Sequence, residues 1–155
     1  MYRTLNFEKI FENVVGPLTV GEPQYPNNLV YVNQAYCDLT GYSFDELKGK
    51  NPGKLLQDRS TPTDLSLTKM MRDQMDNFQQ VNVLLKNYRK DGTWFWNSLY
   101  VYPVLDNLDN SKCVYWVGKA VDVTKHVELE VKFLHTFIST IKDNLNSLRE
   151  DLHKI

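Results

Sequence analysis

The sequence lacks the features that define several large protein classes. It has two cysteines, Cys37 and Cys113, which are too far apart for a metal-spaced pair or a disulfide framework. No apolar run approaches the ~20 residues of a membrane-spanning helix, and the first residues lack the order of a signal peptide. A net charge of -1 leaves no cation excess for binding a phosphate backbone. We therefore expect a cytoplasmic protein whose partners include neither nucleic acid nor a membrane.

The composition is that of a folded domain. Hydrophobic residues make up 42% of the 155-residue chain and charged residues 24%, close to the globular average. The length suits one domain with short appendages. We expect an amphipathic cap helix over residues 1–13, a central domain over residues 14–124 and a C-terminal helix over residues 125–155.

The spacing of the apolar residues changes once within the central domain, from a helical period to strand-like alternation. Before the change, the pattern predicts a short strand over Asn28–Asn33 and several short helices, the longest over Thr63–Asn77. After it, alternation predicts three antiparallel strands: Gln80–Lys90, Thr93–Leu105 and Lys112–Val123. Breakers of regular structure precede the first strand: Pro17, Gly21, Pro23 and Pro26. This order predicts an α+β fold, an antiparallel sheet with short helices packed on one face.

Strand parity places two asparagines on an apolar face. One face of the predicted hairpin carries Val81, Val83, Leu85, Asn87, Phe95, Asn97, Leu99 and Val101. An unpaired buried amide costs roughly 1–3 kcal/mol, so Asn87 and Asn97 need partners. They bond either to each other, the backbone or trapped water, or to a planar polar ligand such as a flavin ring.

The opposite face of the hairpin is aromatic instead of polar. It carries Leu84, Tyr88, Trp94, Trp96, Tyr100 and Tyr102. A solvated sheet face would be polar, so we expect a helix, a second chain or both to cover this one.

Two stretches carry a family resemblance. LVYVNQAYCDLTGYSFDELKGKNP, residues 29–52, resembles the opening of a PAS domain. NYRKDGTWFWN, residues 87–97, with the later YPV and WVGKAVDVT, resembles the LOV subgroup. The resemblance covers roughly residues 14–125. It implies the PAS fold and a bound flavin, with FMN favoured and FAD or no cofactor as the alternatives.

The photoreactive cysteine of the LOV motif GxNCRFLQ is absent. This chain has GKNPGKLLQ from Gly49 to Gln57, one residue longer. The cysteine position falls on Gly53 when counted from Gln57 and on Pro52 when counted from Asn51. Neither residue is a nucleophile, so the resemblance implies a domain that cannot form the cysteinyl adduct.

Other positions of the LOV pattern are carried over residue by residue. The resemblance implies five cofactor-binding residues: Asn87 and Asn97 for the ring, Gln57 after the cysteine motif, and Lys54 and Arg72 for a phosphate. Without the resemblance, Lys54 and Arg72 are equally well read as solvated surface cations. The glutamine that senses the ring in the family is replaced by Ala120.

The last part of the chain has a heptad pattern. Apolar residues follow four-three spacing at Val127, Val131, Leu134, Ile138, Ile141, Leu145, Leu148, Leu152 and Ile155, here called the seam. The seam predicts a parallel homodimer. The alternative is a single amphipathic helix folded back over the aromatic sheet face. Phe133 and Phe137 lie off the seam.

Two classes of function remain. The first is a sensory signal-transduction module that holds a flavin non-covalently and senses redox state or photoreduction through a dimer. The second is a PAS interaction or dimerisation module whose pocket is empty or holds a different small ligand. Either could act on an output domain or a partner protein. All three histidines fall on the C-terminal helix and none pairs with a cysteine, so we expect no catalytic residues, no metal site and no enzyme activity.

Overall fold

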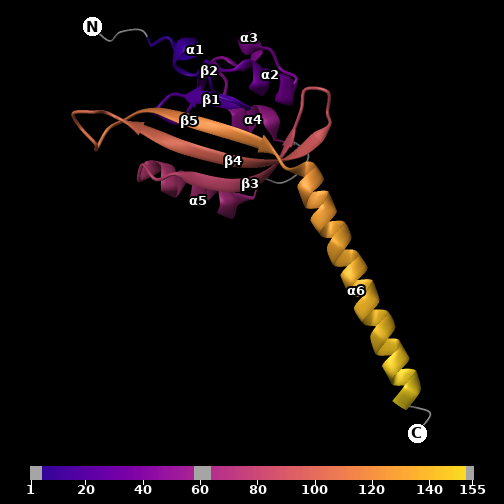
Figure 1. Ribbon diagram of the computed structural model, residues 1–155. Coiled ribbons are helices and arrows are strands. Elements are labelled where there is room, and N and C mark those ends of the chain that lie inside the picture. Colours follow the sequence, from indigo (N-terminus) through magenta and orange to yellow (C-terminus); the bar gives the residue numbers. More distant parts are fainter. Residues whose placement is uncertain (1–4, 58–63, 153–155) are drawn as a thin grey trace. The chain divides into compact units, whose positions relative to one another are not determined.

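The computed structural model describes residues 5–57 and 64–152. It divides into two compact units, residues 1–122 and residues 123–155. The first unit is built on a five-stranded antiparallel sheet of order β2-β1-β5-β4-β3 (Figure 1). Its strands are β1 Leu18–Gly21, β2 Leu29–Val32, β3 Val81–Tyr88, β4 Trp94–Leu105 and β5 Cys113–Asp122. The predicted α+β class, an antiparallel sheet with short helices, is confirmed.

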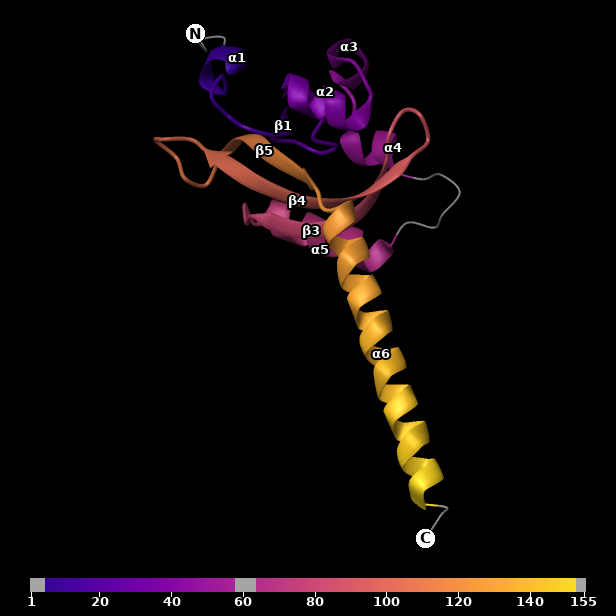
Figure 2. The same cartoon turned by 45° about the vertical axis from the view of Figure 1, so that its right-hand side comes forward.

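Capping residues mark the ends of several helices in the first unit. They are α1 Phe7–Ile10, α2 Gln34–Thr40, α3 Phe44–Leu47, α4 Pro52–Leu56 and α5 Leu65–Asp76. Gly41 ends α2 with a φ of 76°, a conformation that suits glycine. Ser43 and Glu46 form a capping box at the start of α3. Figures 1 and 2 show α2, α3 and α4 grouped together and α5 running beside β3.

The sequence analysis missed strand β1. We expected the prolines and glycines of residues 17–26 to break regular structure, yet β1 lies inside the sheet between β2 and β5. The strand has only four residues, and its register shifts at Gly21, whose added Cβ would lie 3.2 Å from the Asn27 carbonyl oxygen. Long-range pairing, which no local pattern reveals, therefore holds this segment extended.

One helix is shorter than expected, and another begins at a proline. Within the described part of residues 1–13, only Phe7–Ile10 is helical, capped at the start by Asn6. The β-branched pair Val14-Val15 and Gly16 follow, and none of these favours a longer helix. Helix α4 begins at Pro52, because proline is accepted at the first helical position.

The inner face of the sheet has the predicted parity. Val81, Val83, Asn87, Phe95 and Asn97 are all buried. Beside them lies a core cluster of Leu29, Val32, Tyr36, Leu47, Leu56 and Ala120. The two asparagines therefore lie within the core of the first unit.

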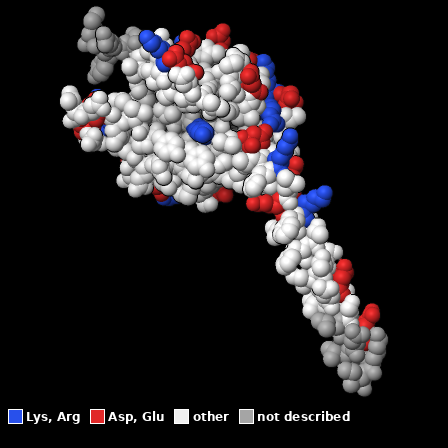
Figure 3. All heavy atoms as spheres, viewed as in Figure 1, with Lys and Arg blue, Asp and Glu red and all other residues white. Residues whose placement is uncertain are grey.

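Within the described residues of the first unit, α1 covers one end of the outer face. Phe7 of α1 lies on it, with ring centroids 5.8 Å from Tyr31 and 5.2 Å from Tyr115. At β3 and β4, by contrast, Leu84 and Trp94 remain exposed. The expected covering helix is thus present as α1 over the β1–β2 side. Figure 3 shows the surface over the sheet as largely uncharged, with charges gathered towards its rim.

The second unit is a single helix, α6 Thr124–Leu152. Seam residues Val131, Leu134, Ile138, Ile141 and Leu145 are exposed along it. The final seam residue, Ile155, lies outside the described residues. None of the helices in the described part of the chain is both long enough and apolar enough to cross a membrane.

Candidate functional site

The centre of the candidate site is a hydrogen-bonded pair of asparagines on neighbouring strands. Asn97 Nδ2 donates to Asn87 Oδ1 at 2.9 Å, and Asn97 Oδ1 accepts from the backbone N–H of Val121 at 3.3 Å. Asn87 Nδ2 reaches only the Lys86 carbonyl, at a long 3.4 Å. Each amide therefore keeps donor capacity that no described residue takes up.

A second polar group on the inner side of the unit lacks a partner. Among the described residues, Gln74 Oε1 is a buried acceptor without a hydrogen bond. Gln74 lies on the half-buried side of α5 with Leu67, Met71 and Met75. Native structures rarely leave such an atom unpaired, so this oxygen is available to a donor beyond the described residues, such as water or a ligand. The sequence analysis missed Gln74, although its helical spacing from Leu67 and Met71 is a readable signal.

Helix α4 carries Pro52 and Gly53, the two residues on which the resemblance places the LOV cysteine position. Pro52 and Gly53 form its first turn, after the Asn51 cap. An added Cβ at Gly53 would lie 3.1 Å from Asn51 Oδ1 and 3.9 Å from Gln57 Nε2. Gln57 is exposed at the end of the helix, and the Lys54 side chain is exposed as well.

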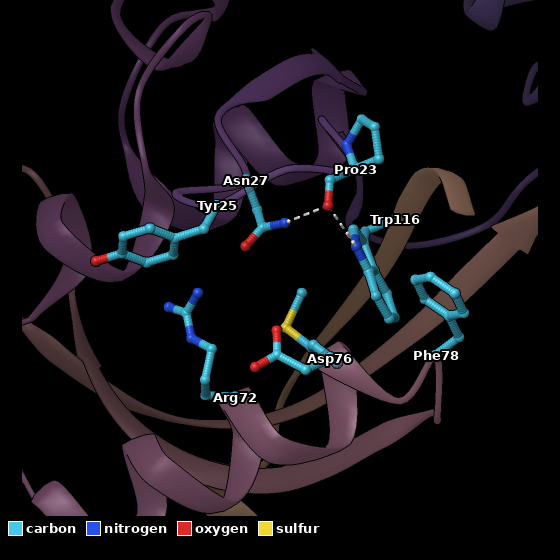
Figure 4. Close-up of a pocket in the computed structure, with 8 residues that line it drawn as sticks. Pro23, Tyr25, Asn27, Arg72, Asp76, Phe78 and Trp116 are labelled. Atoms are coloured by element: carbon cyan, nitrogen blue, oxygen red, sulfur yellow. Dashed lines mark hydrogen bonds between the residues drawn. The ribbon is translucent and has the colours of Figure 1, made fainter. Parts of the chain in front are cut away.

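Arg72 lies at a pocket of about 130 Å³ that is lined by α5, β5 and the β1–β2 loop (Figure 4). Its guanidinium carbon stacks 3.7 Å from the Tyr25 ring centroid. Within the described residues Arg72 has no hydrogen-bond or ion-pair partner, so its donors are free for an anion. Lys54 is not among the described residues that line this pocket. Of the two predicted phosphate-binding cations, Arg72 therefore lines this pocket, and the pairing of Lys54 with it stays a prediction.

Neither thiol has the properties of a nucleophile. Burial raises the pKa of Cys37, with Asp38 adding to the effect, and burial raises the pKa of Cys113. A raised pKa keeps a thiol protonated and inert at neutral pH. Cys37 packs against the core cluster, as expected of a small hydrophobe. Over the described residues, no group of His, Cys, Asp and Glu is placed to hold a metal ion.

Hydrogen bonds of Arg89 connect the β3–β4 hairpin to the end of β5. Its Nε donates to the Leu39 carbonyl at 3.0 Å, and one terminal nitrogen donates to Trp94 O at 3.2 Å. The other donates to the Asp122 carboxylate at 2.7 Å. Asp122 is the last residue of the first unit, so Arg89 fixes the point from which the chain leaves it.

Comparison with known proteins agrees with this geometry. A model of the PAS domain family matches residues 20–125. The LOV domain of a blue-light activated histidine kinase from Erythrobacter litoralis is 34% identical, covers 72% of this chain over 99% of its own length, and superposes with a TM-score of 0.63. This chain belongs to the PAS family and is LOV-like.

Two further relatives of the LOV-like chain are longer proteins. A blue-light photoreceptor of Listeria monocytogenes is 35% identical over 84% of this chain and 53% of its own length. A structure of an RNA-binding Light-Oxygen-Voltage receptor is 27% identical, covers 88% of this chain and 37% of its own, and has a TM-score of 0.73. The chain thus spans about half or less of these proteins.

Several polar groups of this LOV-like domain match what a flavin needs. The spare donors of Asn87 and Asn97, the orphan acceptor of Gln74 and the free guanidinium of Arg72 all suit a polar ring with an anionic tail. Ala120, at the position that the resemblance assigns to a ring-sensing glutamine, supplies no side-chain amide. The groups present therefore fit a flavin held without a covalent bond. The 130 Å³ pocket accommodates only part of one, since sites for such ligands hold ≈300–1,000 Å³.

Proposed function

We propose that this chain is a cytoplasmic sensory module that binds a flavin non-covalently and signals through a dimer, without acting as an enzyme. The observation that carries the proposal is the buried Asn87–Asn97 pair with unused donors inside a LOV-like fold. A bound flavin would supply light absorption and one- or two-electron redox chemistry.

The chain's own residues would hold and orient that ring. The spare amide hydrogens of Asn87 and Asn97 would donate to the carbonyl edge of a flavin, and the Gln74 oxygen would accept from a hydroxyl or ring N–H. Arg72 would pair with the anionic tail, for which the sequence alone favours FMN. Because positions 52 and 53 are proline and glycine, the signal would arise from redox state or photoreduction and not from a bond to sulfur.

We also propose that α6 forms a parallel coiled coil with a second copy. The described seam residues expose apolar side chains that a lone helix would leave in water. Pairing in parallel would bring the two sensory units to the same end of the coil. From there a small change could rotate or splay the helices towards an output domain or partner protein.

A second candidate function is an interaction module with an empty pocket or another small ligand. It is favoured by the hydrogen bond from Asn97 to Asn87, because this bond already uses part of the hydrogen-bonding capacity of both amides. The absence of an amide at Ala120 favours it too.

Absorbance and illumination of the purified chain separate these candidates. We expect flavin absorbance bands and, under blue light, no reversible blue shift of them, because no thiol lies at positions 52 and 53. Gly53→Cys should introduce that reversible shift, and Gly53→Ser, of similar size but without sulfur, should not. A colourless protein that releases no flavin on denaturation would refute flavin binding and support the interaction module.

A further inference from the structure

The seam gives every residue of α6 a place in the seven-residue repeat abcdefg. Val131 and Ile138 take position a, and Leu134 takes position d. Glu130, one residue before an a position, is then a g residue, and His135, one residue after a d position, is an e residue. In a parallel coil with both helices in register, g of one copy faces e of the next repeat in the other copy. Glu130 and His135 would therefore meet across the coil twice, once on each side.

Both side chains are available for this contact. Each is exposed along the single helix. Glu130 Oε1 lies 3.1 Å from Nε2 of His126, one turn earlier on the same helix, and both of these side chains are mostly exposed. A carboxylate has two oxygens that accept hydrogen bonds, so Glu130 can keep His126 and still accept from a second histidine. In the part of α6 that the structure describes, His135 has no hydrogen-bond or ion-pair partner of its own.

The other charges around His135 decide the sign of the effect. On its own helix, Lys132 lies three residues earlier, close enough to repel an imidazolium weakly. Glu128 lies four residues before Lys132 and offsets part of that charge. On the facing helix, Glu130 is the g residue opposite His135, and the seam residues beside it are apolar. A protonated His135 would thus find an opposite charge on the second copy, and a neutral His135 would not.

We propose that Glu130 of one copy and His135 of the other form a pair of contacts that tightens the α6 dimer in mildly acidic solution. The inference rests on the proposed coiled coil. Histidine gains its charge as the pH falls through the range from about 8 to 5, so both symmetric contacts become ion pairs together. An exposed ion pair contributes little by itself, and two of them should tighten the dimer about 5-fold. In an antiparallel coil g faces g, so the same pair would not form.

The test is the Kd of the dimer, measured on the whole chain in the dark by sedimentation equilibrium at one ionic strength. We expect association to be about 5-fold tighter at about pH 5.5 than at about pH 7.5. His135→Gln should remove the difference, because glutamine stays neutral. His126→Gln is the matched control, since His126 is an exposed histidine of the same helix at position c, away from the seam, and it should keep the difference.

Two variants test whether the partner of His135 is Glu130 of the other copy. Glu130→Lys should reverse the pH dependence, because a lysine would repel the protonated histidine. Glu130→Lys/His135→Glu restores opposite charges with their signs exchanged, so association should be tight at both pH values. Circular dichroism should show the same helix content in every variant, because all of these positions are exposed on the single helix.

The outcomes separate the contact from the coil itself. An equal Kd at both pH values, or a difference that survives in His135→Gln, would overturn the inference while the dimer stands. An unreversed pH dependence in Glu130→Lys would also overturn it, because His135 would then be meeting a different group. A chain that is monomeric at every concentration would refute the proposed coiled coil and the inference together.

Discussion

Replacing Asn97 by leucine tests the centre of the site most directly. The substitution removes the 2.9 Å bond from Asn97 Nδ2 to Asn87 Oδ1 and the acceptor of Val121 N–H. Each buried group left unpaired costs roughly 1–3 kcal/mol, and the apolar burial of leucine offsets part of this. We expect the unfolding free energy of the cofactor-free protein to fall by about 1–2 kcal/mol in Asn97→Leu.

The double variant separates a structural pair from a binding pair. In Asn87→Leu/Asn97→Leu, the orphaned Asn87 oxygen disappears, so the loss should be smaller than the sum of the single losses by about 1 kcal/mol. Flavin affinity should behave differently. Each amide donates to the ring independently, so each single variant should weaken binding about 10-fold, and the double variant should not recover.

Urea unfolding of the cofactor-free chain gives the stabilities, and flavin titration gives the affinities. Asn82→Leu is the matched control, because Asn82 is an exposed asparagine on the opposite face of β3. Stability effects that simply add would show that the asparagine bond is not formed. Unchanged flavin affinity in all three variants would remove these residues from the site.

Two further predictions concern assembly and pH. Ile141→Glu or Leu145→Lys should halve the mass measured by light scattering, because a charge in the seam loses roughly 1.5–3 kcal/mol of apolar burial per helix. The circular dichroism of the PAS unit should stay unchanged. An unchanged mass would exclude the seam as the interface. Lys90 and Ser43 lower the pKa of Glu46 to about 2, so its stabilisation is complete above the unfolded value of ≈4.3 and lost towards pH 2. Glu46→Gln should flatten acid unfolding over that window.

Strand parity alone was enough to predict the two central residues of the candidate site, Asn87 and Asn97. Alternation over residues 81–101 depends only on the pleat, and it predicts Asn87 and Asn97 on the buried face, where the structure has them. The capping box of α3 is equally local, since Ser43 and Glu46 lie three positions apart. These features were readable because the residues that decide them are neighbours in sequence.

The features that were missed depend on contacts between distant segments. Strand β1 is held by pairing with β5 almost a hundred residues later. The Arg72 pocket joins Tyr25 and Trp116, which lie far apart in the sequence and share no sequence pattern. Lys54 and Arg72 were grouped by resemblance, but the described lining contains only Arg72. A motif gives the identity of such residues, and only the fold gives their neighbours.

Under the proposed function, Ala120 at the position that the resemblance assigns to a ring-sensing glutamine would change how a signal leaves the site. Asn97 Oδ1 accepts from Val121 N–H at 3.3 Å, so the asparagine pair contacts the backbone of β5 directly. The next residue, Asp122, is held by Arg89 at 2.7 Å, and α6 begins at Thr124. Under the proposed function, a change at the ring therefore reaches the end of β5 through Asn97 and the main chain, without a side chain at position 120. Arg89, which also holds the end of α2 through Leu39 O, then sets how far Asp122 can follow that change.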